Sequence, residues 1–327
     1  MHWLGSVKGI ENELVVDAGH QLHRISISGL RGHGVLKLLL APLQLLKALW
    51  QTFKVYRAVK PAMSLGMGGF ASGPGGLMAK LLRVPLVVHE QNAIAGMTNT
   101  ILSGRANILL QAFNNTFKER KSLHTVGNPV RRSIIEIDEP SERLKNRNGP
   151  LNVLVVGGSL GAVAINDVLI QAMASKELNI NLWHQAGARN FDAVKKGYIE
   201  ANLEAVKVSA FIANMNEAFA WADLLICRSG ALTVSELMAA GVASILVPYP
   251  FAVDDHQSAN GQILVNAGAA ILIPQSSFSI ESLKQEINRL ESDRNIILQM
   301  SKAARTLAKP DSAKIVANYC IEVIHDG

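Results

Sequence analysis

Short runs of apolar and β-branched residues alternate along the chain with longer segments of helical hydrophobic spacing. This alternation is typical of α/β proteins, in which helices connect parallel strands. Eight runs have the length and composition of strands: residues 62–68, 85–90, 106–113, 151–158, 180–187, 223–230, 243–250 and 269–274. Most end in glycine or a polar residue, which is the end of the strand where α/β folds bind ligands.

Length and one polar stretch predict two domains. A chain of 327 residues exceeds the usual size of a single core. Residues 141–150, SERLKNRNGP, are polar and charged and end in Gly-Pro, which indicates a linker. We therefore expect two Rossmann-like domains facing across a cleft. They are residues 1–134 and residues 135–312, with a C-terminal helix at 313–327 that packs back onto the first domain.

Segment 35–60 has an unusually wide apolar face for a helix, with a narrow polar stripe beside it. The apolar residues are Leu36, Leu40, Leu43, Leu46, Trp50 and Phe53, and the polar ones are Lys37, Gln44, Lys47, Gln51 and Lys54. Two interpretations are open. The helix is either buried on most sides, or its outer face rests in the headgroup layer of a membrane.

Composition limits the class of protein. Hydrophobic residues make up 49% and charged residues 18%, which excludes a disordered chain. Two cysteines are too few for a disulfide framework, and no uncharged apolar run reaches the roughly 18 residues of a membrane span. The chain opens without the basic start and apolar core of a secretory signal, so we expect a cytoplasmic location.

Charge is divided unequally between the two predicted domains. Residues 1–134 carry a net charge of +11 and the rest of the chain carries −5, and no acidic residue occurs between Asp17 and Glu90. Such a basic region attracts nucleic acid, anionic lipid or a pyrophosphate. The absence of acids around segment 35–60 favours the membrane interpretation of that helix.

The strongest phosphate signal is the strand, glycine turn and helix of residues 151–167. The turn contains Gly157, Gly158 and Gly161. Glycines let the backbone approach a diphosphate closely, and the helix N-terminus offers N–H groups and the positive end of its dipole. The turn alone does not choose between NAD, FAD and UDP, so an NAD-dependent oxidoreductase remains an alternative, as does a purely structural turn.

Residues 228–241, RSGALTVSELMAAG, predict a second site. Thr233 and Glu236 have the S/T-x-x-E spacing of a capping box, in which Glu236 only caps the helix. In the other interpretation the Glu236 carboxylate accepts hydrogen bonds from two ribose hydroxyls. The spacing leaves both open.

The basic half contains a second glycine-rich run, GMGGFASGPGG at 66–76. We expect a loop whose amides surround a phosphate, so that two such loops in two domains bind a donor and an acceptor. The polar cluster at 89–92, HEQN, follows the next strand and predicts a site at the same end of the sheet. Residues 254–257, DDHQ, could by composition hold a divalent cation or a sugar, and we predict no metal.

These motifs together resemble the MurG family of peptidoglycan glycosyltransferases, which move N-acetylglucosamine from UDP-N-acetylglucosamine to undecaprenyl-linked lipid I and form lipid II. The matching segments run nearly end to end: 27–34, 66–76, 89–99, 126–134, 153–162, 183–187, 211–215, 227–236 and 254–261.

The resemblance implies a GT-B fold and a metal-independent, inverting transfer without a cofactor. It implies a peripheral position at the cytoplasmic face of the anionic inner membrane, and no nucleic-acid partner. Contacts to UDP-N-acetylglucosamine would come from Asn92, Arg131, Ser159, Ile212, Ala231, Leu232, Thr233, Val234, Ser235, Glu236 and Gln257. The acceptor pyrophosphate would lie at Gly68, Gly69, Ser72 and Gly73. The Ile212 backbone would read the uracil edge, Glu236 would hold the ribose and Gln257 would bind sugar hydroxyls.

The family normally opens with a strand and a GGTGGH loop, whose histidine is a favoured general base. This chain aligns from a later point, so we expect that segment to be absent. His89 and Glu90 then become the candidate catalytic residues. We also expect the chain to be inactive or nearly so, which makes a UDP-sugar-binding fragment without catalysis the alternative function.

Overall fold

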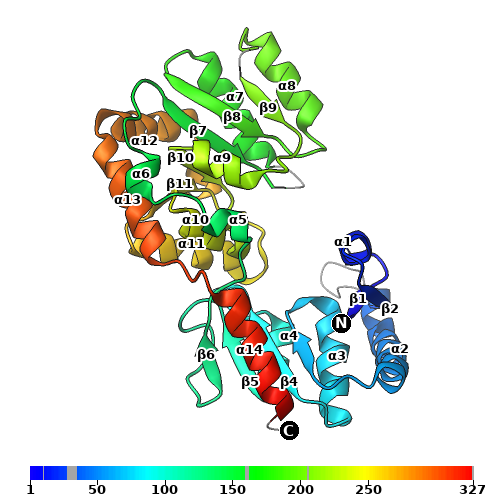
Figure 1. The fold of residues 1–327 in the computed structure, drawn as a ribbon. Coiled ribbons are helices and arrows are strands. Elements are labelled where there is room, and N and C mark those ends of the chain that lie inside the picture. Colours follow the sequence, from blue (N-terminus) through cyan, green and yellow to red (C-terminus); the bar gives the residue numbers. More distant parts are fainter. Residues whose placement is uncertain (10, 28–34, 159–161, 205, 326–327) are drawn as a thin grey trace. The chain divides into compact units, whose positions relative to one another are not determined.

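The computed structural model describes residues 1–9, 11–27, 35–158, 162–204 and 206–325. The chain forms two compact units (Figure 1). Unit 1 contains Met1–Val126 and Ala313–Gly327, and unit 2 contains Gly127–Ser312. The first unit therefore ends at residue 126 and not at the expected residue 134.

A six-stranded parallel sheet forms the centre of unit 2. Its strands in spatial order are β12 (Ala270–Leu272), β11 (Ala243–Leu246), β10 (Leu224–Cys227), β7 (Leu151–Val156), β8 (Ile180–Gln185) and β9 (Lys207–Ser209). The chain runs outward from β7 to β9, then returns to β10 beside β7 and runs outward in the other direction. This is the Rossmann order, and its topological switch point lies between β7 and β10.

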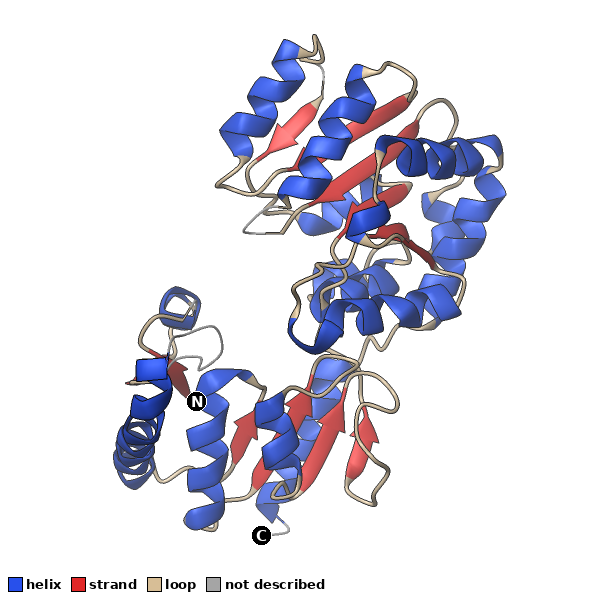
Figure 2. Ribbon diagram, turned by 180° about the vertical axis from the view of Figure 1, so that it is seen from behind, coloured by secondary structure: helices blue, strands red, loops and turns tan. Residues whose placement is uncertain are grey.

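Helices surround the sheet of unit 2 (Figure 2). They are α5 (Arg132–Ile135), α6 (Pro140–Arg143), α7 (Val163–Ala174), α8 (Phe191–Glu200), α9 (Met215–Trp221), α10 (Ala231–Ala240), α11 (His256–Asn266), α12 (Ile280–Ser292) and α13 (Arg294–Thr306). Val153 and Val155 of β7 pack with α7, α8 and α12 in one core cluster. Leu154 between them is also fully buried, and by strand alternation it faces the opposite side.

Unit 1 is built on a four-stranded parallel sheet of order β3 (Ser64–Gly66), β4 (Leu86–Glu90), β5 (Ile108–Gln111) and β6 (Leu123–Thr125). A separate parallel pair is formed by β1 (His2–Ser6) and β2 (Gln21–Ile25). The helices are α1 (Glu11–Asp17), α2 (Val35–Val59), α3 (Gly69–Leu81), α4 (Met97–Ser103) and α14 (Ser312–His325). Val87 of β4 and Leu110 of β5 pack against Val316 and Val323 of α14, so the C-terminal helix covers one face of this sheet.

All eight predicted strands are present, whereas β1, β2, β6 and β9 were not predicted. The central strands are buried on both faces and read as continuous apolar runs, which made them recognisable. The strand β9 has only the residues KVS and β6 only LHT. Each contains a single apolar residue, so neither shows the apolar run or the alternation by which a strand is recognised.

The glycine-rich run at 66–76 is mostly helical and not the expected loop. The turn is confined to Gly68 and Gly69, both at positive φ, and α3 begins at Gly69. Later glycines of the run serve packing. A Cβ at Gly76 would lie 2.6 Å from Leu102 Cδ2 of α4, so only glycine allows these two helices to approach so closely.

Residues 141–150 form a clasp within unit 2 and not the expected linker. The buried Arg143 guanidinium donates to the carbonyls of Ala222 and Gly241, both at 2.6 Å. Arg147 donates to the carboxylate of Asp223 at 3.0 Å, and Arg294 of α13 lies 3.7 Å from its other oxygen. The composition predicted a solvated linker because arginine side chains usually lie at the surface. In the structure, the guanidinium N–H groups donate to backbone carbonyls at the ends of other elements.

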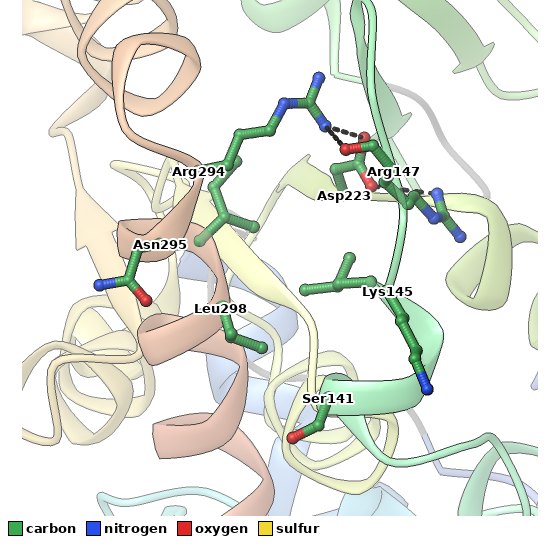
Figure 3. A pocket seen from close by; sticks show the side chains of 9 residues that line it. Ser141, Lys145, Arg147, Asp223, Arg294, Asn295 and Leu298 are labelled. Atoms are coloured by element: carbon green, nitrogen blue, oxygen red, sulfur yellow. Dashed lines mark hydrogen bonds and ion pairs between the residues drawn. The ribbon is translucent and has the colours of Figure 1, made fainter.

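Figure 3 shows Asp223 between Arg147 and Arg294 at the top of a cavity of about 250 Å³. This cavity lies at the amino edge of the sheet, because Asp223 directly precedes β10. Burial, and then the nearby Arg147, lower the pKa of Arg143 to about 10. Asp223 therefore serves as the shared counter-ion of a cluster of arginines that would otherwise repel one another.

Helix α2 is exposed along most of its described length. Among residues 41–59, Ala48, Thr52 and Tyr56 form the buried stripe. On the outside, Leu43, Leu46 and Trp50 are 64%, 63% and 58% exposed. The interpretation of a helix buried on most sides is therefore wrong for this stretch, while the side chains of residues 35–40 lie outside the described part.

None of the helices in the described ranges is both long and apolar enough to cross a membrane.

We predict that Asp223→Ala lowers the free energy of unfolding by about 3 kcal/mol, because it leaves the partly buried Arg147 and Arg294 without their shared counter-ion. Urea unfolding followed by circular dichroism measures the change. The matched control is Lys196→Ala, which removes an exposed ion pair with Glu200 and should change stability by less than about 0.5 kcal/mol. Equal effects of the two substitutions would contradict the role of the clasp.

Candidate functional site

The carboxyl edge of the unit 2 sheet brings the predicted donor motifs together. The turn after β7 begins with Gly157 and Gly158, and the turn after the adjacent β10 comprises residues 228–230. Gly158 has a φ of +77°, which favours glycine. Ser159 lies outside the described residues. Because β7 and β10 flank the switch point, their turns border one crevice, where doubly wound folds bind ligands.

Glu236 pairs with Arg131, and the predicted capping box is wrong. Helix α10 begins at Ala231 with Gly230 as its N-cap, so Thr233 already lies inside the first turn and makes no cap. Arg131 Nη2 donates to Glu236 Oε1 at 2.9 Å, and the Arg131 side chain remains 54% exposed. The ion pair leaves both groups partly exposed, with Glu236 in the second turn of α10.

The segment preceding α5 is fastened to α10 by a second contact. Asn128 Nδ2 donates to Ser235 Oγ at 3.0 Å, and Ser235 Oγ donates to the carbonyl of Ala231. Both Asn128 and Ser235 are buried. These bonds fix the position of Arg131 relative to α10.

Only part of the predicted stretch 231–236 can offer side chains to a ligand. Val234 and Ser235 are buried, whereas Leu232 is 54% exposed and Thr233 and Glu236 are partly exposed. The first N–H groups of a helix have no partner inside it, so the main chain at Ala231 and its neighbours supplies anion donors. A ligand here would meet backbone amides, the Thr233 hydroxyl and the Glu236 carboxylate.

Arg228 joins three loops at this edge. Its guanidinium donates to the carbonyls of Val247 and Pro248 at 2.9 and 3.0 Å and to Gln275 Oε1 at 2.6 Å. It also lies 5.4 Å from the centre of the Tyr249 ring. Burial lowers the pKa of Arg228. The loops after β10, β11 and β12 are therefore held together by one side chain.

Gln257 lies in the first turn of α11 and is held in one orientation. Its Oε1 accepts from the Tyr249 N–H at 2.9 Å. The side chain of Asn260 on the same helix donates to the Ser229 carbonyl, which attaches α11 to the β10–α10 turn. With Oε1 engaged, Gln257 presents its amide N–H groups to a ligand.

The remaining predicted donor contact in unit 2 is Ile212, between β9 and α9. Ile212 is buried as a whole residue, with 4% of its surface exposed. Asp254 and Asp255 both have a φ of +52°, a left-handed conformation that turns the chain into α11. Within the described residues, no group of three or more His, Cys, Asp or Glu side chains could hold a metal ion.

Cys227 ends β10 beneath these turns and is buried. Burial, followed by the Glu236 carboxylate, raises the pKa of its thiol. The thiol stays protonated at neutral pH and behaves as a small apolar side chain.

In unit 1, the carboxyl edge of the sheet joins the glycine turn before α3 to the 89–92 cluster. A Cβ at Gly68 would lie 3.5 Å from both Gln91 Oε1 and Asn99 Nδ2. Gly69, Ser72 and Gly73 follow in the first turn of α3, where the Ser72 hydroxyl donates to the Gly68 carbonyl. The predicted acceptor residues therefore form a helix N-terminus beside a polar cluster.

Glu90 organises the loop that follows β4. Its Oε1 accepts from the backbone and side-chain amides of Asn92, and its Oε2 accepts from Gly96 N and Asn99 Nδ2, at 2.8–3.1 Å. His89 and Glu90 are only 0% and 2% exposed. The catalytic role expected of this pair stays a prediction, and its burial favours a role in positioning the loop.

Three residues with structural roles at these edges were missed by sequence reasoning: Asn128, Arg228 and Asn260. Each lies inside a segment that resembles the family, but no spacing rule assigns it a contact. A buried asparagine or arginine finds its partner on another strand or helix, so the sequence carries no local signal for it.

Two family models match the chain. The glycosyltransferase family 28 C-terminal domain matches residues 152–316, and the glycosyltransferase family 28 N-terminal domain matches residues 1–111.

Curated relatives cover nearly the whole chain. A UDP-N-acetylglucosamine--N-acetylmuramyl-(pentapeptide) pyrophosphoryl-undecaprenol N-acetylglucosamine transferase of Marinobacter nauticus is 51% identical over 98% of this chain and 89% of its own length. The Pseudomonas syringae protein of the same name is 46% identical over 99% and 91%.

Solved structures agree with the fold. The crystal structure of Acinetobacter baumannii MurG has a TM-score of 0.84 and 38% identity, covering 98% of this chain and 90% of that one. The calicheamicin glycosyltransferase CalG4 has a TM-score of 0.67 at 13% identity, covering 99% and 90%, and shows likeness of fold alone.

We predict that Glu90→Gln lowers the free energy of unfolding by about 2 kcal/mol. The glutamine side chain replaces one accepting oxygen with an NH₂ group, which then faces N–H groups that themselves donate. Amide hydrogen exchange at Asn92 and Gly96 should accelerate at the same time. Glu119→Gln, at an exposed position in the same unit, is the control and should leave both unchanged. Unaltered exchange in Glu90→Gln would refute the assignment of Glu90 to the loop.

Proposed function

The chain belongs to glycosyltransferase family 28 and has the GT-B fold, and we propose that it transfers N-acetylglucosamine from UDP-N-acetylglucosamine to undecaprenyl-linked lipid I. The product is lipid II, a precursor of peptidoglycan. The proposal draws on the names of relatives that match 98–99% of the chain. It also draws on the arrangement of the carboxyl edge of unit 2.

The observation that carries the proposal is the Arg131–Glu236 pair, which lies one turn after the start of α10. A ribose needs a carboxylate that accepts from two hydroxyls, and a diphosphate needs cationic and N–H donors nearby. Glu236 offers the first, and Arg131 with the amides at the start of α10 offers the second. We assign the donor to this edge, with its sugar hydroxyls at Gln257 and its uracil at the main chain of Ile212.

The reaction we propose is a direct displacement. The C4 hydroxyl oxygen of the muramyl sugar forms a bond with C1 of N-acetylglucosamine while the bond from C1 to the diphosphate oxygen breaks. UDP leaves with the electron pair, and the hydroxyl proton passes to a base. Arg131 and the helix N–H groups stabilise the negative charge that develops on the diphosphate.

The acceptor side of the proposal belongs to unit 1. The N-terminus of α3, with Gly68, Gly69, Ser72 and Gly73, offers backbone donors for the acceptor pyrophosphate. The loop held by Glu90 lies next to it, and Asn92 belongs to that loop. We propose that His89 and Glu90 act mainly by holding this loop.

We predict that Glu236→Ala and Arg131→Ala each lower kcat/KM for UDP-N-acetylglucosamine by roughly tenfold to a hundredfold, the scale of a lost charged hydrogen bond. Release of UDP in the presence of a lipid I analogue measures the rate. Arg132→Ala is the matched control, because the adjacent Arg132 side chain is 89% exposed and pairs with Glu136 on the surface.

The outcomes separate the two candidate functions. Turnover that falls in both variants but not in the control supports the transferase. UDP binding without turnover would support the UDP-sugar-binding alternative, and NAD binding without UDP binding would overturn both.

We further propose that α2 rests on the anionic cytoplasmic face of the inner membrane. Leu43, Leu46 and Trp50 are spaced so that they share one side of the helix, and all three are largely exposed. Exposed lysines and arginines accompany them: Lys47, Lys54, Arg57 and Lys60. Apolar side chains flanked by cations are the composition of a helix that lies in the headgroup layer.

We predict that combined serine substitutions at Leu43, Leu46 and Trp50 lower binding to phosphatidylglycerol vesicles by at least about tenfold, from the apolar area that no longer inserts. Co-sedimentation measures the bound fraction. Ile199→Ser, at an exposed apolar position of unit 2, should bind like the unmodified protein. Undiminished binding of the triple variant would contradict the proposed membrane face.

A further inference from the structure

Two aromatic side chains lie together in the loop between β11 and α11, at the carboxyl edge of unit 2. Tyr249 and Phe251 are 43% and 78% exposed. Their rings pack edge to face, with centres 5.6 Å apart and an angle of 71° between the planes. The pair therefore offers a flat apolar surface at the edge to which the donor is assigned.

A hydrogen-bonded turn fixes the backbone from which Phe251 projects. The N–H of Ala252 donates to the Tyr249 carbonyl at 3.1 Å, which closes a β-turn with Pro250 at its second position and Phe251 at its third. Proline suits the second position because its ring already restricts φ. The exposed ring is thus carried by a preformed turn, so a ligand that covers it does not have to order this backbone.

Tyr249 connects this loop to polar groups on both of its sides. Its N–H donates to Gln257 Oε1 at 2.9 Å, and its ring centre lies 5.4 Å from the guanidinium carbon of Arg228 in the turn before α10. Gln257 is the residue to which the sugar hydroxyls are assigned. Its free amide N–H groups therefore lie in the same loop region as the two aromatic rings.

The order of the strands agrees with a sugar at this loop. From one side of the sheet the order is β9, β8, β7, β10 and β11. The uracil is assigned to Ile212 after β9, and the ribose and diphosphate to Glu236 and Arg131 at α10, which follows β10. The donor has a fixed covalent order of uracil, ribose, diphosphate and sugar. Continued in the same direction, this order brings the sugar to the loop after β11.

We infer that Phe251 packs against the sugar ring of the donor and that Tyr249 holds Phe251 in place for this contact. The inference rests on the proposed function, because it takes the donor to be a UDP-sugar bound at this edge. The hydroxyl and acetamido groups of N-acetylglucosamine lie around the rim of its ring, which leaves a face of C–H groups. An aromatic ring covers such a face, while the Gln257 amide donates to a hydroxyl at the rim.

The test compares UDP-N-acetylglucosamine with UDP, which lacks the sugar. Phe251→Ala should lower the affinity for UDP-N-acetylglucosamine about fivefold to tenfold, the scale of one aromatic contact, and change the affinity for UDP less than about twofold. Phe251→Trp keeps a flat ring and should retain most of the affinity for the sugar nucleotide. Competitive displacement of fluorescently labelled UDP gives all of these affinities.

Two substitutions at Tyr249 test its positioning role. Tyr249→Ala should lower the affinity for UDP-N-acetylglucosamine relative to UDP, whereas Tyr249→Phe keeps the ring and should restore the ratio of the unmodified protein. Ile199→Ala is the matched control, because Ile199 is an apolar residue of α8 in the same unit and is 47% exposed. Its ratio of the two affinities should also equal that of the unmodified protein. Phe251 is largely exposed, so its replacement leaves no core cavity and the variant should fold.

Two results for Phe251→Ala would overturn the inference while leaving the proposed function standing. One is an equal loss of affinity for UDP-N-acetylglucosamine and for UDP, and the other is no loss for either nucleotide. Failure of the unmodified protein to bind UDP would instead overturn the proposed function, and this inference with it.

Discussion

The return of the chain from β9 to β10 is the constraint on which the candidate site of unit 2 depends. Parallel strands place their carboxyl ends at one edge, and the reversal between β7 and β10 opens a crevice there because the two following helices leave in opposite directions. The glycine turn, the start of α10 and the first turn of α11 meet at this edge although they are far apart in the sequence. A different strand order would leave each motif intact and separate them all.

Buried polar side chains hold this edge in place. Arg228 gathers three loops, Asn260 attaches α11 to the β10–α10 turn, and His184 ties α7 to β8. Each satisfies its hydrogen-bonding groups with partners on other elements, which gives directional restraint that apolar packing lacks. Thr233, Glu236 and Gln257 stay partly exposed because these buried neighbours hold the loops in place.

In unit 1, different residues of the same helix have different tasks. Helix α2 buries a narrow stripe through Ala48, Thr52 and Tyr56 and leaves large apolar side chains outside. Such an arrangement is unfavourable in water unless another phase covers it, which is why it supports a membrane-facing role. In α3, glycines first provide a tight turn and then allow close contact with α4.

The sequence by itself determined the α/β class, eight of the strands, the glycine turn after β7 and the resemblance to the family. These depend on local composition and periodicity, which a single chain displays. The tertiary structure decided whether Glu236 caps its helix or pairs with Arg131, whether residues 141–150 link two domains or clasp one, and whether α2 is buried. Each of these outcomes depends on a partner that only folding brings close. The charge of Glu236, the polarity of residues 141–150 and the helical spacing of α2 are the same in both alternatives.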